Sequence, residues 1–244
     1  MCSHGWAASP WKVPHSTERY PRANIISHYK VRKYLHHHSS AQRYLRWLSI
    51  KAEVFNVGNY RRNDTPQPMA EFFDNKNPEG ERMRRAAAEA ALEDMMKWFR
   101  GGGIIAIFDA TNSTKDRRRW IKNKCDENGI ETLFVESKCD DDDLIMSNIL
   151  EVKTTSPDYK GLDPEVAAQD FRNRIRNYEK VYQTIDEDEN DLTYLKIMDV
   201  GKQVIINRIQ DYLQSRVVYY LMNLHIKPRS IWLSRVSYFR SFRN

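Results

Sequence analysis

The feature of this sequence that most restricts its fold is a short apolar run between glycines and an aspartate. Gly101-Gly102-Gly103 precede the run at residues 104–108, and Asp109 follows it. A strand that is apolar at every position is buried on both faces, which is typical of a parallel sheet covered by helices. The run therefore predicts an α/β protein whose ligands bind at the carboxyl ends of its strands.

Further strands and helices are expected to alternate along the chain. Strands are expected at residues 52–57, 132–135, 195–198 and 230–233. Helices are expected at residues 39–49, 78–99, 143–152 and 165–185, and one more from a cap at Asn112 or Ser113 to Asn128-Gly129. Residues 204–213 are assigned to a helix or to a loop followed by a helix. The apolar residues at 217–224 fit the period of a helix and that of a strand equally well. This alternation predicts a mostly parallel sheet with helices on both faces.

The charge of the chain is unevenly distributed. The net charge is +6, but residues 1–50 contain eight lysines and arginines against one glutamate, which leaves the other 194 residues at −1. A nearly neutral main domain with local basic clusters favours a small anionic ligand over a nucleic acid. No apolar run approaches the ~18 residues of a membrane span, so no membrane partner is expected.

The first 38 residues are expected to form an irregular or disordered segment. They contain Pro10, Pro14 and Pro21 among scattered aromatic and histidine residues. They lack the apolar centre of a signal peptide, and the three cysteines of the chain have neither a disulfide pattern nor zinc-like spacing. We therefore expect a cytoplasmic protein without a structural metal site.

The segment after the apolar run carries the side chains of a phosphate site. Asp109 ends the strand, and Thr111 follows at the start of the next helix, where backbone N–H groups favour anions. Arg117, Arg118 and Arg119 come one turn later. An aspartate in this place can hold Mg²⁺ or orient an attacking hydroxyl. The alternative interpretation is a capped helix with a solvated basic face.

Three other basic groups are candidate anion contacts, and each has a structural alternative. The arginines at residues 61–62 follow a strand end and otherwise belong to a surface turn. The arginines at residues 84–85 lie near a helix start, where positive charge interacts unfavourably with the helix dipole. Their presence there implies some other favourable interaction. Arg174 and Tyr178 are four residues apart and share a helix face, where Tyr178 is alternatively a core residue covered by Arg174.

Cys139 is a weak candidate for a nucleophile. It follows an expected strand and precedes four aspartates at residues 140–143. Nearby carboxylates raise the pKa of a thiol, so Cys139 is expected to have a packing or polar role close to a ligand.

A series of ordered segments resembles the 6-phosphofructo-2-kinase/fructose-2,6-bisphosphatase family. The segments are FNVGNYRR, MRRAAAEAAL, IFDATNSTKDRR, FVESKCDD, NILEVKTTSPDY, DFRNRIRNYE, LKIMDVG and QSRVVYYLMNLHIKPRSIWLSR, and they extend from about Ser39 to Arg235. The kinase domain of this family has a P-loop α/β fold and transfers the γ-phosphoryl group of MgATP to the 2-hydroxyl of fructose 6-phosphate. The resemblance thus implies a sugar-phosphate kinase acting in the control of glycolysis, with fructose 6-phosphate, ATP and Mg²⁺ as ligands.

The resemblance also implies roles for individual residues. The positions that match fructose 6-phosphate contacts are Arg61, Arg84, Thr111, Arg117, Lys153, Arg174 and Tyr178. Asp109 and Cys139 match the positions usually marked catalytic. Part of the ATP site is matched by Asn148, Ile149, Leu150, Glu151, Val152 and Lys153. Residues 39–235 are accordingly assigned to a kinase-like domain.

The sequence departs from the family in two places. The family's glycine-rich loop, G-x-x-x-x-G-K-[ST], is expected just before the helix at residues 39–49, where this chain reads IISHYKVRKYLHHHSS without a glycine. The chain is therefore expected to lack the triphosphate cradle and the first core strand. Val236 stands where the phosphatase domain of the family has its nucleophilic histidine, so no bisphosphatase activity is expected. Residues 236–244 are assigned to a tail in its place.

Three interpretations of the chain are open on sequence alone. It is a kinase that makes fructose 2,6-bisphosphate, or it is a truncated or alternatively spliced homologue without catalysis. Such a homologue binds sugar phosphate, or it dimerises with an intact relative. The third interpretation is a damaged gene model whose true N-terminus restores the glycine-rich loop. A homodimer, or a heterodimer with a family member, is the protein partner that the resemblance implies.

Overall fold

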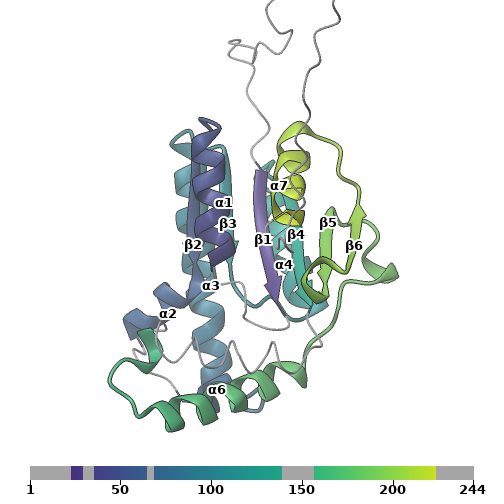
Figure 1. Cartoon of the computed structure of the whole chain (residues 1–244). Coiled ribbons are helices and arrows are strands. Elements are labelled where there is room, and N and C mark those ends of the chain that lie inside the picture. The colour runs from purple at the N-terminus through teal and green to yellow at the C-terminus, as the bar shows by residue number, and fades with distance from the viewer. Residues whose placement is uncertain (1–22, 30–35, 65–68, 139–156, 224–244) are drawn as a thin grey trace, which may run out of the picture.

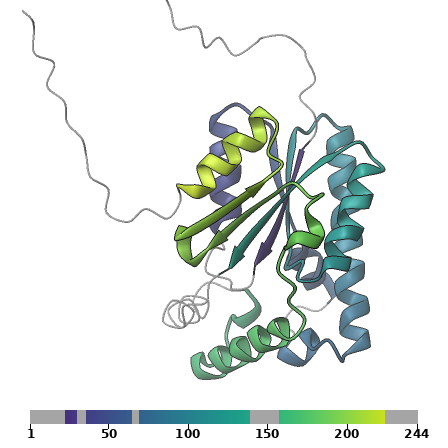
Figure 2. The ribbon, with the colours of Figure 1, turned by 90° about the vertical axis from the view of Figure 1, so that its right-hand side faces the viewer.

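The protein has one sheet of six strands with helices on both of its faces (Figures 1 and 2). The structure is a computed structural model that describes residues 23–29, 36–64, 69–138 and 157–223. The strand order is β2-β3-β1-β4-β5-β6, in which β1 to β5 are parallel and β6 is antiparallel to β5. The expected α/β fold with a mostly parallel sheet is therefore confirmed.

The apolar run of the sequence forms part of a central strand. The strands are β1 Ala23–Tyr29, β2 Ala52–Asn56, β3 Ile105–Asp109, β4 Glu131–Lys138, β5 Tyr194–Met198 and β6 Gln203–Asn207. Residues 105–108 of β3 are all buried, as the absence of polar residues in the run predicts. Both expected assignments of residues 204–213, a helix or a loop followed by a helix, are wrong for residues 204–207, which belong to β6 and pair with β5.

The position of β1 overturns one expectation from the sequence. The expected irregular N-terminal segment, and the expected loss of a first core strand, are wrong for Ala23–Tyr29. These residues form β1, which pairs with β3 on one side and with β4 on the other (Figure 1). Hydrogen bonds on both edges of a strand come from segments far away in sequence, so local composition does not reveal them.

The helices lie mostly where helices are expected, but the one over residues 57–64 is not expected from the sequence, and the one expected at residues 165–185 ends at Glu179. They are α1 His36–Trp47, α2 Val57–Asp64, α3 Pro78–Arg100, α4 Lys115–Asp126, α6 Pro164–Glu179 and α7 Tyr212–Met222. The cap of α4 is Thr114 rather than Asn112 or Ser113, since its hydroxyl accepts a hydrogen bond from the backbone N–H of Arg117 at 3.2 Å. The helix expected at residues 143–152 and the strand expected at residues 230–233 lie outside the described residues.

The two faces of the sheet carry separate apolar cores. On one face, α3 and α4 pack around Phe108 and Phe134, and on the other, α1 and α7 pack around Ile107 and Leu195. Neighbouring residues of a strand point to opposite faces, so a run without polar residues serves both cores. Helix α6 crosses below the end of the sheet at which β1 and β3 end (Figures 1 and 2). This arrangement leaves the carboxyl ends of the strands facing α6.

Candidate functional site

A cavity of about 710 Å³ lies at the carboxyl ends of β2 and β3. Its walls come from α2, α3, α4, α6 and the segment between β3 and α4. The polar residues that line it include Asn56, Arg61, Arg84, Arg85, Asp109, Thr111, Arg117, Asp158, Arg174 and Tyr178. Parallel α/β sheets bind their ligands at this end, and a cavity of this size suits a small phosphorylated molecule.

Asp109 stands at the floor of the cavity, at the last position of β3. The pairing of β2 with β3 places Asn56 opposite Asp109, and the Asn56 amide donates a hydrogen bond to the carboxylate. Thr111 is exposed on the segment that follows, before the cap of α4 at Thr114. The strand end thus presents a half-buried carboxylate and a hydroxyl-bearing loop to the same cavity.

One wall of the cavity is built around a buried carboxylate. Asp158, on the short helix η2 (Pro157–Tyr159), accepts hydrogen bonds from Arg61 at 2.9 Å, Arg62 at 2.7 Å and Arg174 at 3.0 Å. Burial by itself raises the pKa of Asp158, but the hydrogen bond from Arg62 and the charges of Arg61 and Arg62 hold it at about 2. We call Asp158, Arg61, Arg62 and Arg174 the Asp158 cluster. It shows that residues 61–62 lie on α2 rather than in a surface turn.

Arg174 has a second carboxylate partner and aromatic neighbours. Its Nε donates to Asp170 one turn earlier on α6 at 2.9 Å, and Asp170 also accepts from the hydroxyl of Tyr159 at 2.8 Å. The guanidinium lies 4.3 Å from the centre of the Phe73 ring and 4.8 Å from that of Tyr159. Tyr178 packs its ring against Phe73 with 6.0 Å between the ring centres. Arg174 is therefore fixed in place by charge and packing.

The facing wall carries three arginines, two of which lie against an indole ring. Arg84 and Arg85 come from α3, and Arg117 and Trp120 come from α4. The guanidinium carbon of Arg117 lies 4.8 Å from the centre of the Trp120 ring, and that of Arg85 lies 5.6 Å from it. Arg84 donates to the backbone oxygen of Phe72. We call Trp120, Arg84, Arg85 and Arg117 the Trp120 cluster.

The Trp120 cluster has an excess of positive charge near Arg117. Burial, and after it the charge of Arg85, lowers the pKa of Arg117 to about 10. Among the described residues, no carboxylate forms an ion pair with Arg117. A cation in this situation gains when an anion enters the cavity beside it.

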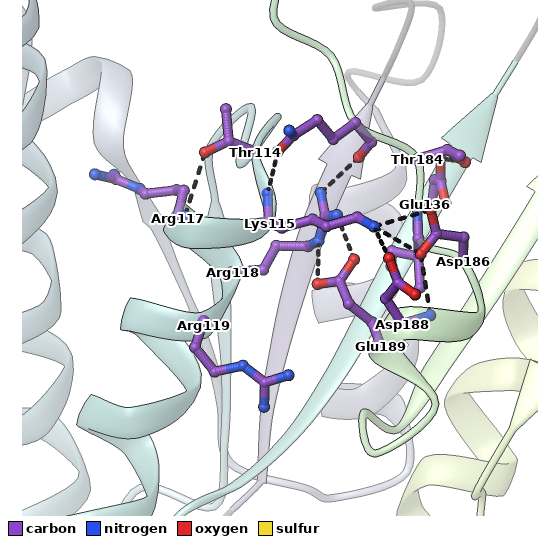
Figure 3. Close-up of polar contacts among 12 residues, drawn as sticks. Thr114, Lys115, Arg117, Arg118, Arg119, Glu136, Thr184, Asp186, Asp188 and Glu189 are labelled. Atoms are coloured by element: carbon purple, nitrogen blue, oxygen red, sulfur yellow. Dashed lines mark hydrogen bonds and ion pairs between the residues drawn. The ribbon is translucent and has the colours of Figure 1, made fainter.

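The three consecutive arginines of α4 have three different surroundings (Figure 3). Arg117 lines the cavity. Arg118 is fully buried, where it forms a two-point ion pair with Glu189 and donates to the backbone oxygen of Gln183 at 2.8 Å. Arg119 is exposed and pairs with Asp191. Residues 117–119 therefore form neither a single phosphate-binding cluster nor a uniformly solvated face.

The segment that holds Arg118 is itself fixed to the sheet. Glu136, buried on β4, accepts from the hydroxyl of Thr184 at 2.7 Å and from the backbone N–H of Ile185 at 3.0 Å (Figure 3). Lys115 at the start of α4 bridges Asp186 and Asp188, each at 2.9 Å (Figure 3). These contacts connect residues 182–189 to the start of α4, which carries the cavity residue Arg117.

Most of the site residues implied by the resemblance come together in the cavity. Arg61, Arg84, Thr111, Arg117, Arg174, Tyr178 and Asp109 all line it. The others, Cys139, Asn148, Ile149, Leu150, Glu151, Val152 and Lys153, lie outside the described residues.

The residues that sequence reasoning missed are Asn56, Asp158 and Trp120. Asn56 ends an expected strand beside the strand of Asp109, so the parallel pairing was a usable signal. Asp158 lies in the family-like segment NILEVKTTSPDY and Trp120 directly follows the three arginines, but no pattern gives either a role, and only their neighbours in space show their importance. Within the described residues, no group of three or more His, Cys, Asp or Glu side chains is placed to hold a metal ion. None of the described helices is long and apolar enough to cross a membrane.

The chain is similar to known proteins over most of its length. The family model for 6-phosphofructo-2-kinase matches residues 35–228, a range that begins after β1. A fructose-2,6-bisphosphatase of Saccharomyces cerevisiae is 47% identical over 197 residues, which are 79% of this chain and 44% of the relative. The human 6-phosphofructo-2-kinase/fructose-2,6-bisphosphatase 4 is 48% identical over 196 residues, which are 79% of this chain and 42% of the relative.

The chain therefore spans less than half the length of these curated relatives. Among solved structures, a putative kinase from Chloroflexus aurantiacus aligns with 85% of this chain and 100% of its own, at 9% identity and a TM-score of 0.48.

Proposed function

Because the chain belongs to the 6-phosphofructo-2-kinase family, we propose that its cavity binds fructose 6-phosphate. The observation that carries this proposal is the convergence of Arg61, Arg84, Arg117 and Arg174 on one cavity of about 710 Å³. Arginine presents planar N–H groups that match the oxygens of a phosphate, so a cavity with several arginines favours a phosphate ester over a neutral sugar.

The remaining polar side chains suit the sugar part of the ligand. Thr111 and Tyr178 supply hydroxyl groups that bind sugar hydroxyls, and Asp109 supplies a carboxylate that accepts a hydrogen bond from the reacting 2-hydroxyl. The hydrogen bond from Asn56 holds the Asp109 carboxylate in one orientation. In this proposal Asp109 marks the end of the cavity at which a phosphoryl group arrives.

The chain itself fits Mg²⁺ better than it fits ATP. Mg²⁺ is commonly bound through one or two carboxylates together with phosphate oxygens, and Asp109 supplies such a carboxylate. A triphosphate needs glycines that let backbone N–H groups surround it. The residues between β1 and α1 read KVRKYL at positions 30–35 and contain no glycine. These residues do not fit a glycine-rich phosphate loop.

A second candidate function follows from the lack of glycine at residues 30–35. The cavity that we assign to the sugar phosphate has its arginines in place, but the connection between β1 and α1 has the wrong composition for a triphosphate. The chain is then a homologue that binds fructose 6-phosphate without phosphorylating it. Synthesis of fructose 2,6-bisphosphate from MgATP, with contributions from Cys139 and residues 148–153, is the other candidate that family membership supports.

Binding is tested first, by isothermal titration of the purified full chain with fructose 6-phosphate and with fructose. We expect heat of binding with the phosphate ester and affinity for fructose at least about tenfold weaker, since charge-assisted hydrogen bonds contribute about 1.5–3 kcal/mol each. Equal affinity for the two sugars would show that the arginines are not a phosphate site.

The two candidate functions are separated by an assay for ATP-dependent formation of fructose 2,6-bisphosphate. If the wild-type chain makes this product and the Asp109→Asn variant does not, the chain is a kinase. Binding of fructose 6-phosphate without any product from wild type assigns it as a non-catalytic sugar-phosphate binder. A mixture of this chain with an intact family member, tested by size-exclusion chromatography, shows whether the two associate.

A further inference from the structure

Arg85 belongs to the cavity although the resemblance assigns it no role. It lines the cavity on α3, next to Arg84 in sequence, and faces α4. Its guanidinium lies 5.6 Å from the centre of the Trp120 ring, and Trp120 also contacts the guanidinium of Arg117 at 4.8 Å. One indole ring therefore supports two cations that come from different helices.

The ion pair that Arg85 makes is weak enough to be exchanged. Arg85 pairs with Glu89 one turn along α3 at 3.2 Å, and the two side chains are 63% and 50% exposed. Exposed pairs of this kind contribute little to the stability of a helix. A phosphate dianion in the cavity offers Arg85 a more highly charged partner, so the pair with Glu89 does not prevent ligand binding.

The arginines on the opposite wall of the cavity are held by buried carboxylates instead. Arg61 and Arg174 are both paired with Asp158, and Arg174 is paired with Asp170 as well. These carboxylates offset the positive charge of that wall. Arg117 has no carboxylate partner among the described residues, and the charge of Arg85 adds to its own. The two cavity arginines without an ion pair among the described residues, Arg84 and Arg117, therefore both belong to the Trp120 cluster.

We propose that Arg85 is a further phosphate-binding residue and that Trp120 is a positioning residue that holds Arg85 and Arg117 at one subsite. The ligand class is the phosphate monoester of a small sugar, and its phosphate binds at the Trp120 cluster rather than at the Asp158 cluster. This inference rests on the proposed function and makes it more specific.

The chain offers a matched control for Arg85. Arg82 lies on the same helix, forms an exposed pair with Glu79 at 2.6 Å, and does not line the cavity. Arg85→Ala is expected to weaken binding of fructose 6-phosphate by about fivefold to tenfold, and Arg82→Ala by less than about twofold. Both variants are measured by isothermal titration, with thermal melts to show that both fold.

The role of Trp120 needs a measurement that simple loss of packing does not change. Trp120→Phe, which keeps an aromatic face, should retain affinity within about threefold, and Trp120→Leu should lose affinity to the extent that Arg85→Ala does. The double variant Arg85→Ala/Trp120→Leu should weaken binding by less than the product of the two single effects, because Trp120 acts partly through Arg85.

The outcomes separate this inference from the proposed function. If wild type does not bind fructose 6-phosphate, the proposed function fails. If wild type binds it and Arg85→Ala behaves like Arg82→Ala, the inference about Arg85 is wrong while the proposed function stands. Full additivity of Arg85→Ala and Trp120→Leu would overturn the positioning role of Trp120.

Discussion

The two arginine-rich walls of the cavity differ in what surrounds their cations. In the Asp158 cluster, three arginines share one buried carboxylate, whose side chain is 1% exposed. In the Trp120 cluster, an aromatic ring takes the central place, and Arg117 has no ion pair within the described parts of the chain. The cavity arginines of the Asp158 cluster, Arg61 and Arg174, are therefore paired with buried carboxylates, whereas Arg84 and Arg117 of the Trp120 cluster form no ion pair among the described residues.

This difference shows that a count of basic residues does not measure anion affinity. A buried carboxylate fixes neighbouring guanidinium groups and also offsets their charge. An aromatic ring orients a guanidinium but leaves its charge available to a ligand. We infer that the Asp158 cluster mainly shapes the cavity and that the Trp120 cluster mainly attracts the anion.

The strongest test of this comparison is Asp158→Asn. The variant removes the charge that three arginines share, so the free energy of unfolding should fall by about 3–5 kcal/mol. Urea unfolding followed by circular dichroism measures the change. Glu79→Gln, which removes the carboxylate of an exposed pair with Arg82, is the control and should change stability by less than about 1 kcal/mol. A similar small change for both variants would mean that the Asp158 cluster is not structural.

Lowering the pH should reduce the stability that the Asp158 cluster contributes. The pKa of Asp158 is lowered in the folded state from 3.8 to about 2, so its contribution to stability is full above pH 4 and is lost as the pH falls toward 2. That loss amounts to about 2.5 kcal/mol for this carboxylate. Urea midpoints between pH 5 and pH 2 measure it. The midpoint of Asp158→Asn should fall less over this range, and parallel curves for the two proteins would contradict the assignment.

Arg117→Ala should affect ligand binding more than folding. No buried carboxylate loses its partner, so the unfolding free energy should change little, whereas affinity for fructose 6-phosphate should fall by about tenfold or more. Titration calorimetry and urea unfolding on the same preparation give both values. Intact affinity in this variant would place the phosphate at the Asp158 cluster instead.

The smallest effect is expected for Arg119→Ala. Arg119 and Asp191 are both nearly half exposed, so removing the pair should change stability by less than about 1 kcal/mol and leave binding of fructose 6-phosphate unchanged. Thermal melts and titration calorimetry check this. Arg118→Ala, one residue earlier, provides the contrast, because it leaves buried Glu189 without its partner.

Much of the fold was predictable because its signals are local. The apolar run at residues 104–108 predicted a strand buried on both faces, and β3 has that environment. The periodic stripe after Pro78 predicted the helix that is α3. The failures came where distant pairing decides the structure. β1 and β6 are strands because their neighbours in the sheet accept their backbone hydrogen bonds, and local composition at residues 23–29 and 203–207 does not show this.

The chemical character of the cavity was also determined by the sequence. Asp109 at a strand end, followed by a hydroxyl-bearing loop and arginines, predicted a phosphate site, and of these residues Asp109, Thr111 and Arg117 line one cavity. The different surroundings of the arginines were decided only by the tertiary structure. Residues 117–119 are identical arginines in sequence, yet they face a cavity, a buried glutamate and the solvent. The physical reason is that the pairing and burial of a guanidinium depend on its neighbours in space, and these come from distant parts of the chain.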